Sequence, residues 1–210
     1  MTSVPTLLND PPTETQRAIA RETLRRGGII AHPTETVYGL GADPFHPEAL
    51  QRILSLKGRD AAKGFILLIP DRPALDPLVA AIPVTARRLM EHFWPGPLTL
   101  ILPARPGLPA PLTGGRSTLA VRHSSSRHVT TLLEFWNRPL VSTSANRSGA
   151  PPLRDGKQVI DLFGAEIDCL QLGHCPPDTP PSTIVAFDEK QPRIIRMGTI
   201  TQAMIRAVLG

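Results

Sequence analysis

Basic residues gather early in the chain, where the sequence reads KGR over residues 57–59 and Lys63 follows shortly after. Arginine binds a phosphate group through two parallel hydrogen bonds, and lysine supplies a mobile point charge. Lys57, Arg59 and Lys63 could therefore hold a triphosphate together. The same residue types also suit the solvated C-terminal end of a helix, where cations interact favourably with the helix dipole. Taken alone, this cluster favours the helix-end interpretation.

Two further clusters carry hydroxyl groups. Residues 33–41 (PTETVYGLG) combine threonines, which can bind a small polar ligand, with glycines, which let the backbone approach that ligand closely. Residues 142–146 (STSAN) offer small donors for phosphate oxygens. On spacing alone, a polar turn is the simpler explanation of the first cluster. The second is predicted to follow an apolar strand directly, which favours a functional edge there.

Generic nucleotide-binding and hydrolytic motifs are absent from the sequence. It contains no G-x-x-x-x-G-K-[ST] phosphate loop, no G-x-G-x-x-G, no nucleophile elbow, and no H-E-x-x-H or CxxC metal motif. Cys169 and Cys175 lack the usual zinc spacing, so we expect two ordinary thiols and assign no metal ligand. The residues alone therefore predict an α/β domain with convergent basic and hydroxyl clusters, but no particular reaction.

Length and composition predict one globular domain. The chain has 210 residues, of which 41% are hydrophobic, enough for a core of its own. The net charge of +5 fits a polyanionic partner such as a nucleotide or tRNA, although many enzymes without such a partner are equally basic. The first residues show no signal-peptide pattern, and no stretch approaches the ~20 apolar residues that span a bilayer. We therefore expect a cytoplasmic protein without membrane contact.

The elements that must position these clusters can be read from caps and apolar runs. Thr13, with Gln16 three residues later, predicts a capping box that opens a helix, and glycines 27–28 predict its end. A second helix is predicted to begin near Pro47 and to end at Lys57. Further helices are expected over residues 74–80, 84–93, 126–135, 159–163 and 202–208. Strands are expected over residues 28–31, 65–69, 98–102, 118–122, 139–141, 169–172, 183–187 and 193–196.

The interspersed order of these elements predicts an α/β fold with a mixed, twisted sheet. Residues 155–156 and the proline-rich residues 176–181 are expected to form flexible surface loops and not domain boundaries.

Segments at these same clusters resemble the YrdC/TsaC family of threonylcarbamoyl-AMP synthases. They are PTETVYGLG (33–41), KGR (57–59), KGFILLI (63–69), WPGPLTLILPA (94–104), LAVR (119–122), PLVSTSANRSG (139–149), PSTI (181–184) and IIR (194–196). Eight segments in the family's order and at compatible spacing are specific, and they cover nearly the whole chain. The resemblance implies the short bacterial form: a single YrdC-like domain over residues 1–210, with its core at about 13–200, in which a twisted mixed sheet flanked by helices surrounds a central concave cavity.

The resemblance also implies site residues. Lys57 and Arg59 would be catalytic residues at the ATP phosphates. The ATP-binding set would be Lys57, Arg59, Lys63, Thr118, Ser142, Ser144, Asn146 and Arg196, and the threonine-binding set would be Thr34, Arg122 and Ser182. Glu35 is the nearest acid and could hold a metal or the amine, but a surface carboxylate in a loop is the commoner arrangement. His32 departs from the family pattern, in which an aromatic residue is common at this position.

The implied reaction joins L-threonine, bicarbonate and ATP, with Mg²⁺, to give threonylcarbamoyl-AMP and pyrophosphate. This product is the activated intermediate for N6-threonylcarbamoyladenosine (t6A) at tRNA position 37, so the implied partners are tRNA or double-stranded RNA and the proteins of a t6A transferase complex. Two alternatives remain open. One is a non-catalytic module that binds double-stranded RNA or tRNA. The other is a paralogue that uses another carbamoyl acceptor, as in hydrogenase maturation, although such proteins usually carry zinc-finger-like cysteines that this sequence lacks.

Overall fold

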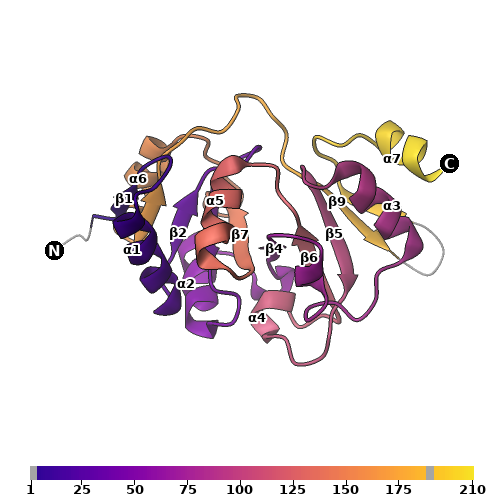
Figure 1. Ribbon diagram of the computed structural model, residues 1–210, viewed down its shortest axis with the longest axis horizontal. Coiled ribbons are helices and arrows are strands. Elements are labelled where there is room, and N and C mark those ends of the chain that lie inside the picture. The colour runs from indigo at the N-terminus through magenta and orange to yellow at the C-terminus, as the bar shows by residue number, and fades with distance from the viewer. Residues whose placement is uncertain (1–3, 188–191) are drawn as a thin grey trace.

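The computed structural model describes residues 4–187 and 192–210. Within them, ten strands form one sheet in the order β1-β8-β2-β3-β7-β4-β6-β5-β9-β10, and helices pack against it (Figure 1). The strands are β1 Thr6–Leu8, β2 Ile30–His32, β3 Gly39–Ala42, β4 Ile66–Leu68, β5 Leu98–Pro103, β6 Thr118–Arg122, β7 Leu140–Ser144, β8 Cys169–Gln171, β9 Thr183–Phe187 and β10 Pro192–Arg196. The helices are α1 Glu14–Arg25, α2 Pro47–Lys57, α3 Val84–Phe93, α4 Ala110–Thr113, α5 Arg127–Trp136, α6 Gly156–Phe163 and α7 Gln202–Leu209, and two short 3₁₀ helices are η1 Ala61–Lys63 and η2 Pro73–Leu75.

The sheet mixes both strand directions. Strand β8 runs parallel to β1 and β2, and the pairs β4–β6 and β5–β9 are also parallel. Strand β7 is antiparallel to both of its neighbours, β3 and β4. The predicted α/β class with a mixed sheet is therefore confirmed. No helix in the described part of the chain is long and apolar enough to cross a bilayer.

Alternating side chains on the central strands pack into two separate hydrophobic cores, one on each face of the sheet. Leu68 and Leu140 join a buried cluster with α1 and α5. Their neighbours Leu67 and Val141 join the larger cluster, which includes residues of α2, α3 and α6. Ser142, two residues after Leu140, points to the same face as α1 and α5, so any site built on it opens on that face.

Local signals explain the helices that begin and end where the sequence predicts. The Thr13 hydroxyl accepts from the Gln16 backbone N–H, and the Gln16 side chain in turn accepts from the Thr13 N–H, so the capping box is present. Helix α2 begins at Pro47 and ends at Lys57, where Gly58 adopts a left-handed conformation with φ of 59°. The cationic cluster therefore lies at the C-terminal end of α2, as expected.

Three local predictions are wrong. Residues 74–80 form only the short η2 turn, because Pro77 has no N–H to continue a helix and Val79 instead bridges to Ala104. Residues 39–41, expected as part of a loop, lie in β3 and pair with both β2 and β7. Asp155, expected in a flexible loop, caps α6 by accepting from the Lys157 backbone N–H at 2.8 Å.

Two consecutive glycines after α4 meet different surroundings, and this difference can be tested. Both adopt positive φ values, 67° for Gly114 and 72° for Gly115. A Cβ on Gly114 would lie 2.5 Å from the carbonyl oxygen of Ala62 in η1, whereas a Cβ on Gly115 would meet nothing within 4 Å.

Gly115→Ala should therefore cost about 1–2 kcal/mol of unfolding free energy, for the left-handed backbone alone. Gly114→Ala should cost more, because η1 must also move. Urea denaturation of the two variants measures the difference. Equal losses would show that η1 can move away from a Cβ at position 114 without a cost in stability.

Candidate functional site

A cavity of about 230 Å³ opens on the sheet face where β7, β4, β6 and β5 lie side by side. Its floor is a cross-strand row in which Ser142 pairs with Ile66, Ile66 with Ala120, and Ala120 with Ile101. The row is apolar except at Ser142. A larger hollow of about 560 Å³ lies elsewhere, between α2 and the segment around Glu166, and is lined by none of the predicted ligand residues.

Most of the predicted ligand residues converge on the cavity although they are far apart in the sequence. Those that line it are Thr34, Arg59, Lys63, Arg122, Ser142, Ser144, Ser182 and Arg196. Thr118 does not line it, but it shares a strand face with Ala120 at the start of β6. Lys57 and Asn146 also lie outside the lining.

Lys57 joins the end of α2 to the tip of β7. Its ammonium group donates to the Ser144 carbonyl, to the Asn146 carbonyl at 2.8 Å, and to Asn146 Oδ1 at 3.0 Å. These acceptors use all three of its N–H donors. Burial and the nearby charge of Arg59 lower the pKa of Lys57 to about 7, whereas the three oxygen atoms favour its charged form. In this structure Lys57 shapes the β7 tip, and a phosphate contact by Lys57 stays a prediction.

The SxN residues hold one another. Ser144 Oγ donates to Asn146 Oδ1 at 2.6 Å, and Asn146 Nδ2 donates to the carbonyls of Arg147 and Ala150 at 3.0 and 2.7 Å. The STSAN segment therefore consists of the end of β7 and a turn held by its own side chains, and Ser144 lines the cavity. The predicted convergence of this turn with the end of α2 is confirmed by the bonds of Lys57.

Arg59 lies on the cavity wall next to β7. Its Nη1 donates to Thr143 Oγ1 at 2.9 Å and its Nη2 to the Gly64 carbonyl at 2.8 Å, whereas Nε is buried without a partner among the described residues. The guanidinium also lies over the Phe65 ring, 5.8 Å from the ring centroid. These contacts fix the direction of its charge relative to the cavity.

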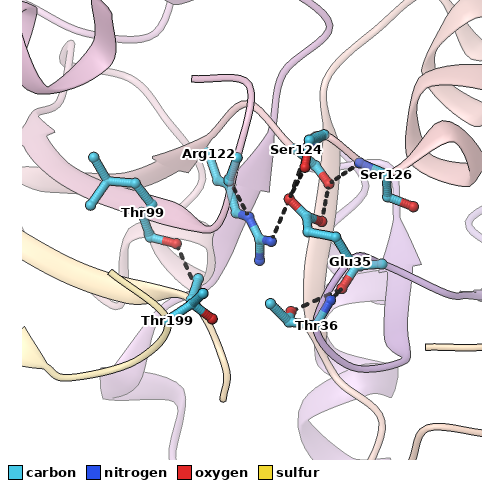
Figure 2. Close-up of polar contacts among 12 residues, drawn as sticks. Glu35, Thr36, Thr99, Arg122, Ser124, Ser126 and Thr199 are labelled. Carbon is cyan, nitrogen blue, oxygen red and sulfur yellow. Dashed lines mark hydrogen bonds and ion pairs between the residues drawn. The ribbon is translucent and has the colours of Figure 1, made fainter. Parts of the chain in front are cut away.

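Arg122 and Glu35 form a buried ion pair beside Thr34. Arg122 Nη2 lies 2.9 Å from Glu35 Oε1, and the two side chains are 7% and 18% exposed. Figure 2 shows the two groups pointing toward each other, with Ser124 on the far side of the carboxylate. The expectation of a surface carboxylate at residue 35 is therefore wrong: the guanidinium of Arg122 and donors from the segment after β6 enclose it. No local sequence signal predicted this burial.

Thr34 and Ser182 also have defined partners. Thr34 Oγ1 accepts from the backbone N–H of Thr36 at 3.0 Å and of Val37 at 3.1 Å, so it closes its own turn. Arg196 donates to the Ser182 carbonyl at 2.8 Å and to Ser182 Oγ at 3.0 Å. Residues predicted to contact different ligands, Arg196 for ATP and Ser182 for threonine, are thus directly bonded.

His32 lies beneath the edge of the cavity, packed on two glycines of β3. A Cβ on Gly39 would lie 2.6 Å from Ser142 Oγ and 3.0 Å from the His32 ring, and a Cβ on Gly41 would lie 3.2 Å from that ring. The glycines thus make room for the imidazole and Ser142, which lie 3.4 Å apart. Complete burial lowers the pKa of His32 to about 4, so the ring is neutral at pH 7.

The cavity carries a one-sided charge. Its described lining includes five cationic side chains and no acidic one: Arg59, Lys63, Arg116, Arg122 and Arg196. Burial and the charges of Arg122 and Arg59 lower the pKa of Arg196, as expected where cations face a common space. Sequence reasoning missed Arg116. The glycines at 114–115 are a turn signal that could have indicated it.

The fold and the cavity define an α/β domain with a cationic cavity on one face of a mixed sheet, a lining that suits small anionic molecules. The family model for Sua5/YciO/YrdC proteins, described as telomere recombination, matches residues 22–198. The chain therefore belongs to the Sua5/YciO/YrdC family, and the resemblance read from its motifs is confirmed.

Named relatives are similar over most of the chain. A threonylcarbamoyl-AMP synthase of Thiobacillus denitrificans is 47% identical over 144 residues, which are 69% of this chain and 77% of the relative. A protein of the same name from Pyrococcus abyssi is 38% identical over 192 residues, 91% of this chain but 56% of the relative.

Solved structures share the fold. P. abyssi Sua5 complexed with L-threonine has a TM-score of 0.92 at 35% identity, over 99% of this chain and 61% of that chain. E. coli YciO has a TM-score of 0.82 at 26% identity, over 93% of this chain and 96% of that chain. This chain therefore spans less than two thirds of the archaeal proteins that it matches.

The role of Lys57 at the β7 tip can be tested by unfolding. Lys57→Met should lower the unfolding free energy by about 1–2 kcal/mol, because the Ser144 and Asn146 oxygens lose their donor. Lys157→Met, at an exposed position on α6, is the matched control and should change it little. Chemical denaturation measures both, and equal values would contradict a bracing role for Lys57.

Burial of His32 predicts a pH dependence of stability. As the pH falls from about 6.5 to 4, the unfolded chain takes up a proton on His32 that the folded chain does not, so unfolding becomes easier. Between pH 7 and pH 4 this effect should amount to roughly 3 kcal/mol. His32→Asn should lose that much less stability than the parent over this range, as measured by urea denaturation.

The exposed His92→Asn is the control for that comparison, and it should follow the parent. Identical pH profiles for the parent and His32→Asn would mean that the folded protein protonates this imidazole as readily as the unfolded chain does.

Proposed function

We propose that this chain is an L-threonylcarbamoyladenylate synthase, which makes threonylcarbamoyl-AMP and pyrophosphate from L-threonine, bicarbonate and ATP. The observation that carries the proposal is the cavity in which five cationic side chains meet without an acidic one. Such a lining suits two anionic ligands, a triphosphate and a carboxylate. The names of the relatives from T. denitrificans and P. abyssi support the same activity.

The triphosphate would bind at the wall formed by Arg59, Lys63 and Arg116. Arg59 is fixed by Thr143 and Gly64, so its charge is oriented before the ligand arrives. The Ser144 side chain at the β7 tip lies on the same cavity. The predicted ATP contacts of Ser142, Thr118, Asn146, Arg196 and Lys57 belong to this proposal.

Threonine would bind through its carboxylate to Arg122. Arg122 Nε donates to the Gly96 carbonyl, and Nη2 forms the ion pair with Glu35, but neither Nη1 nor Nη2 donates a hydrogen bond in the described part of the chain. Ser182 and Thr34 would complete the amino-acid subsite. The complex of P. abyssi Sua5 with L-threonine supports a threonine subsite in this fold.

The chemistry proceeds in two steps. The uncharged threonine amine attacks the carbon atom supplied by bicarbonate. This step gives a carbamate and releases water. A carbamate oxygen then attacks the α-phosphorus, the bond from this phosphorus to the bridging oxygen breaks, and pyrophosphate leaves. Binding both reactants in one cavity supplies the orientation, and the cations beside the triphosphate stabilise the charge that develops on the leaving group.

Mg²⁺ has no protein-built site in the described residues. No group of three histidine, cysteine, aspartate or glutamate side chains there could hold a metal ion, and the oxygens of Glu35 are already bonded. We therefore assign Mg²⁺ to the phosphate oxygens of ATP, which supply its preferred ligands, and derive no step through it.

The product is a mixed anhydride, which hydrolyses readily, so a further protein must consume it. We propose that a t6A transferase complex in the cytoplasm passes the threonylcarbamoyl group to adenosine 37 of tRNA. The positive net charge is compatible with tRNA or double-stranded RNA at the surface.

The reaction itself is the first test. Purified protein with ATP, L-threonine and labelled bicarbonate should release pyrophosphate and incorporate label into an adenylate only when all three substrates are present. RNA binding with a steep salt dependence, without pyrophosphate release, would instead support a binding module. Release that depends on another amino acid or acceptor would support a paralogue of different substrate.

Arg59 provides the sharpest single substitution. Arg59→Ala should reduce kcat/KM for ATP on the order of 100-fold, because one oriented cation at the leaving group is lost. Arg206→Ala, on the exposed side of α7, should leave turnover unchanged. Activity of Arg59→Ala close to that of the parent would contradict the phosphate role, provided that both variants melt like the parent.

A further inference from the structure

The Glu35 carboxylate connects three segments around the amino-acid side of the cavity. Its Oε1 accepts from the Ser125 backbone N–H at 2.9 Å and from Ser125 Oγ at 3.1 Å, and its Oε2 accepts from Ser124 Oγ at 2.5 Å. Arg122 Nη2 approaches Oε1 at 2.9 Å. Glu35 itself belongs to the turn closed by Thr34. The carboxylate therefore ties the β2–β3 turn to β6 and to the segment that follows it.

These contacts argue against a direct chemical role for Glu35. Oε1 already accepts two hydrogen bonds and lies in the ion pair with Arg122, Oε2 accepts one hydrogen bond, and the side chain is largely buried. Burial alone would raise the pKa of Glu35, but the charge of Arg122 and the donors of Ser124 and Ser125 outweigh it and hold the pKa below its usual value. A carboxylate of low pKa is a weak general base for an amine.

The same contacts fix the direction of Arg122. The guanidinium is planar, and two of its three nitrogens face protein groups: Nε donates to the Gly96 carbonyl at 3.2 Å, and Nη2 lies 2.9 Å from Glu35 Oε1 in the ion pair, without a hydrogen bond among the described residues. The position of the third nitrogen, Nη1, is then set by the plane, on a side chain that lines the cavity. Without Glu35, the guanidinium could turn about its long side chain and a ligand would have to order it on binding.

We propose that Glu35 is the positioning residue of the amino-acid subsite, acting through Arg122. It fixes the position of Arg122 Nη1, the guanidinium nitrogen that receives the ligand's α-carboxylate. It also holds the Thr34 turn beside Arg122. This inference rests on the proposed function, because it takes the carboxylate-bearing ligand to be an amino acid. Its effect is confined to that ligand, since Arg59 and Lys63 on the triphosphate side have no hydrogen bond to Glu35 among the described residues.

The test separates the two ligands by steady-state kinetics. Glu35→Gln keeps the size of the side chain and removes its charge. It should raise KM for threonine about tenfold, leave kcat within about twofold, and leave KM for ATP unchanged. Glu166→Gln is the matched control: Glu166 also pairs with an arginine, Arg147 at 3.2 Å, but outside the cavity, and all three constants should stay at the parent values.

Direct threonine binding, measured by calorimetry without ATP, tests whether the effect passes through Arg122. Glu35→Gln should weaken binding about tenfold in the parent and less than twofold in an Arg122→Lys background. Ser124→Ala removes one donor to Glu35 and leaves the ion pair in place. It should weaken binding about threefold, and it provides the measurement in case Glu35→Gln does not fold.

The outcomes distinguish this inference from the proposed function. An unchanged threonine affinity in Glu35→Gln, equal losses in both backgrounds, or equal losses for threonine and ATP would overturn the positioning role. A parent protein that binds threonine but releases no pyrophosphate would overturn the synthase reaction and leave the positioning role standing. A parent that binds no threonine would overturn both.

Discussion

Strand β7 lies between β3 and β4, and the site depends on this pairing. Hydrogen bonds in register place Ser144 opposite Gly39 and Ser142 opposite both Gly41 and Ile66. Strands that are far apart in the chain thereby become neighbours, and each brings one polar segment to the site. A slip of one residue in β7 would turn Ser142 and Ser144 to the opposite face of the sheet and place Val141 where the cavity floor now lies.

The pairing also explains why the polar segments are stable before any ligand binds. A cavity lined by five cations is unfavourable on electrostatic grounds, because like charges in a partly buried space repel. The neighbours relieve part of this cost. Arg122 is paired with Glu35, and the guanidinium groups of Arg59 and Arg196 donate to the carbonyls of Gly64 and Ser182. The remaining positive potential is what an anionic ligand would neutralise.

Some residues hold the shape of the cavity walls, and others reach into the cavity where a ligand would bind. Lys57, Asn146 and Glu35 are bonded mainly to protein groups and shape the walls, whereas Arg59, Arg122 and Ser144 reach the cavity. Similar proteins of the Sua5/YciO/YrdC family share the overall fold, with TM-scores of 0.92 and 0.82 for the archaeal and E. coli structures. The match to the archaeal structure covers 99% of this chain, so the walls described here lie within the matched region.

Local signals in the sequence determined the elements that depend on few neighbours. The capping box at Thr13, the proline start of α2 and the apolar run before β4 act within one or two turns of chain, so their positions could be predicted. The family motifs also predicted which segments converge. Their meaning came from resemblance, because spacing alone left each cluster as an ordinary turn or helix end.

Only the tertiary structure decided what individual polar groups do. Residues 39–41 read as a loop because glycines disfavour strands, yet pairing with β2 and β7 on either side makes them a strand. Glu35 read as a surface acid because burying an unpaired carboxylate is costly, and its partner Arg122 is 87 positions away in the sequence numbering. The sequence indicated a free cation at Lys57, because its hydrogen-bond acceptors belong to β7 and the turn after it, which are distant in sequence. In each case the deciding partner is distant in sequence, and no local pattern of residue types carries that information.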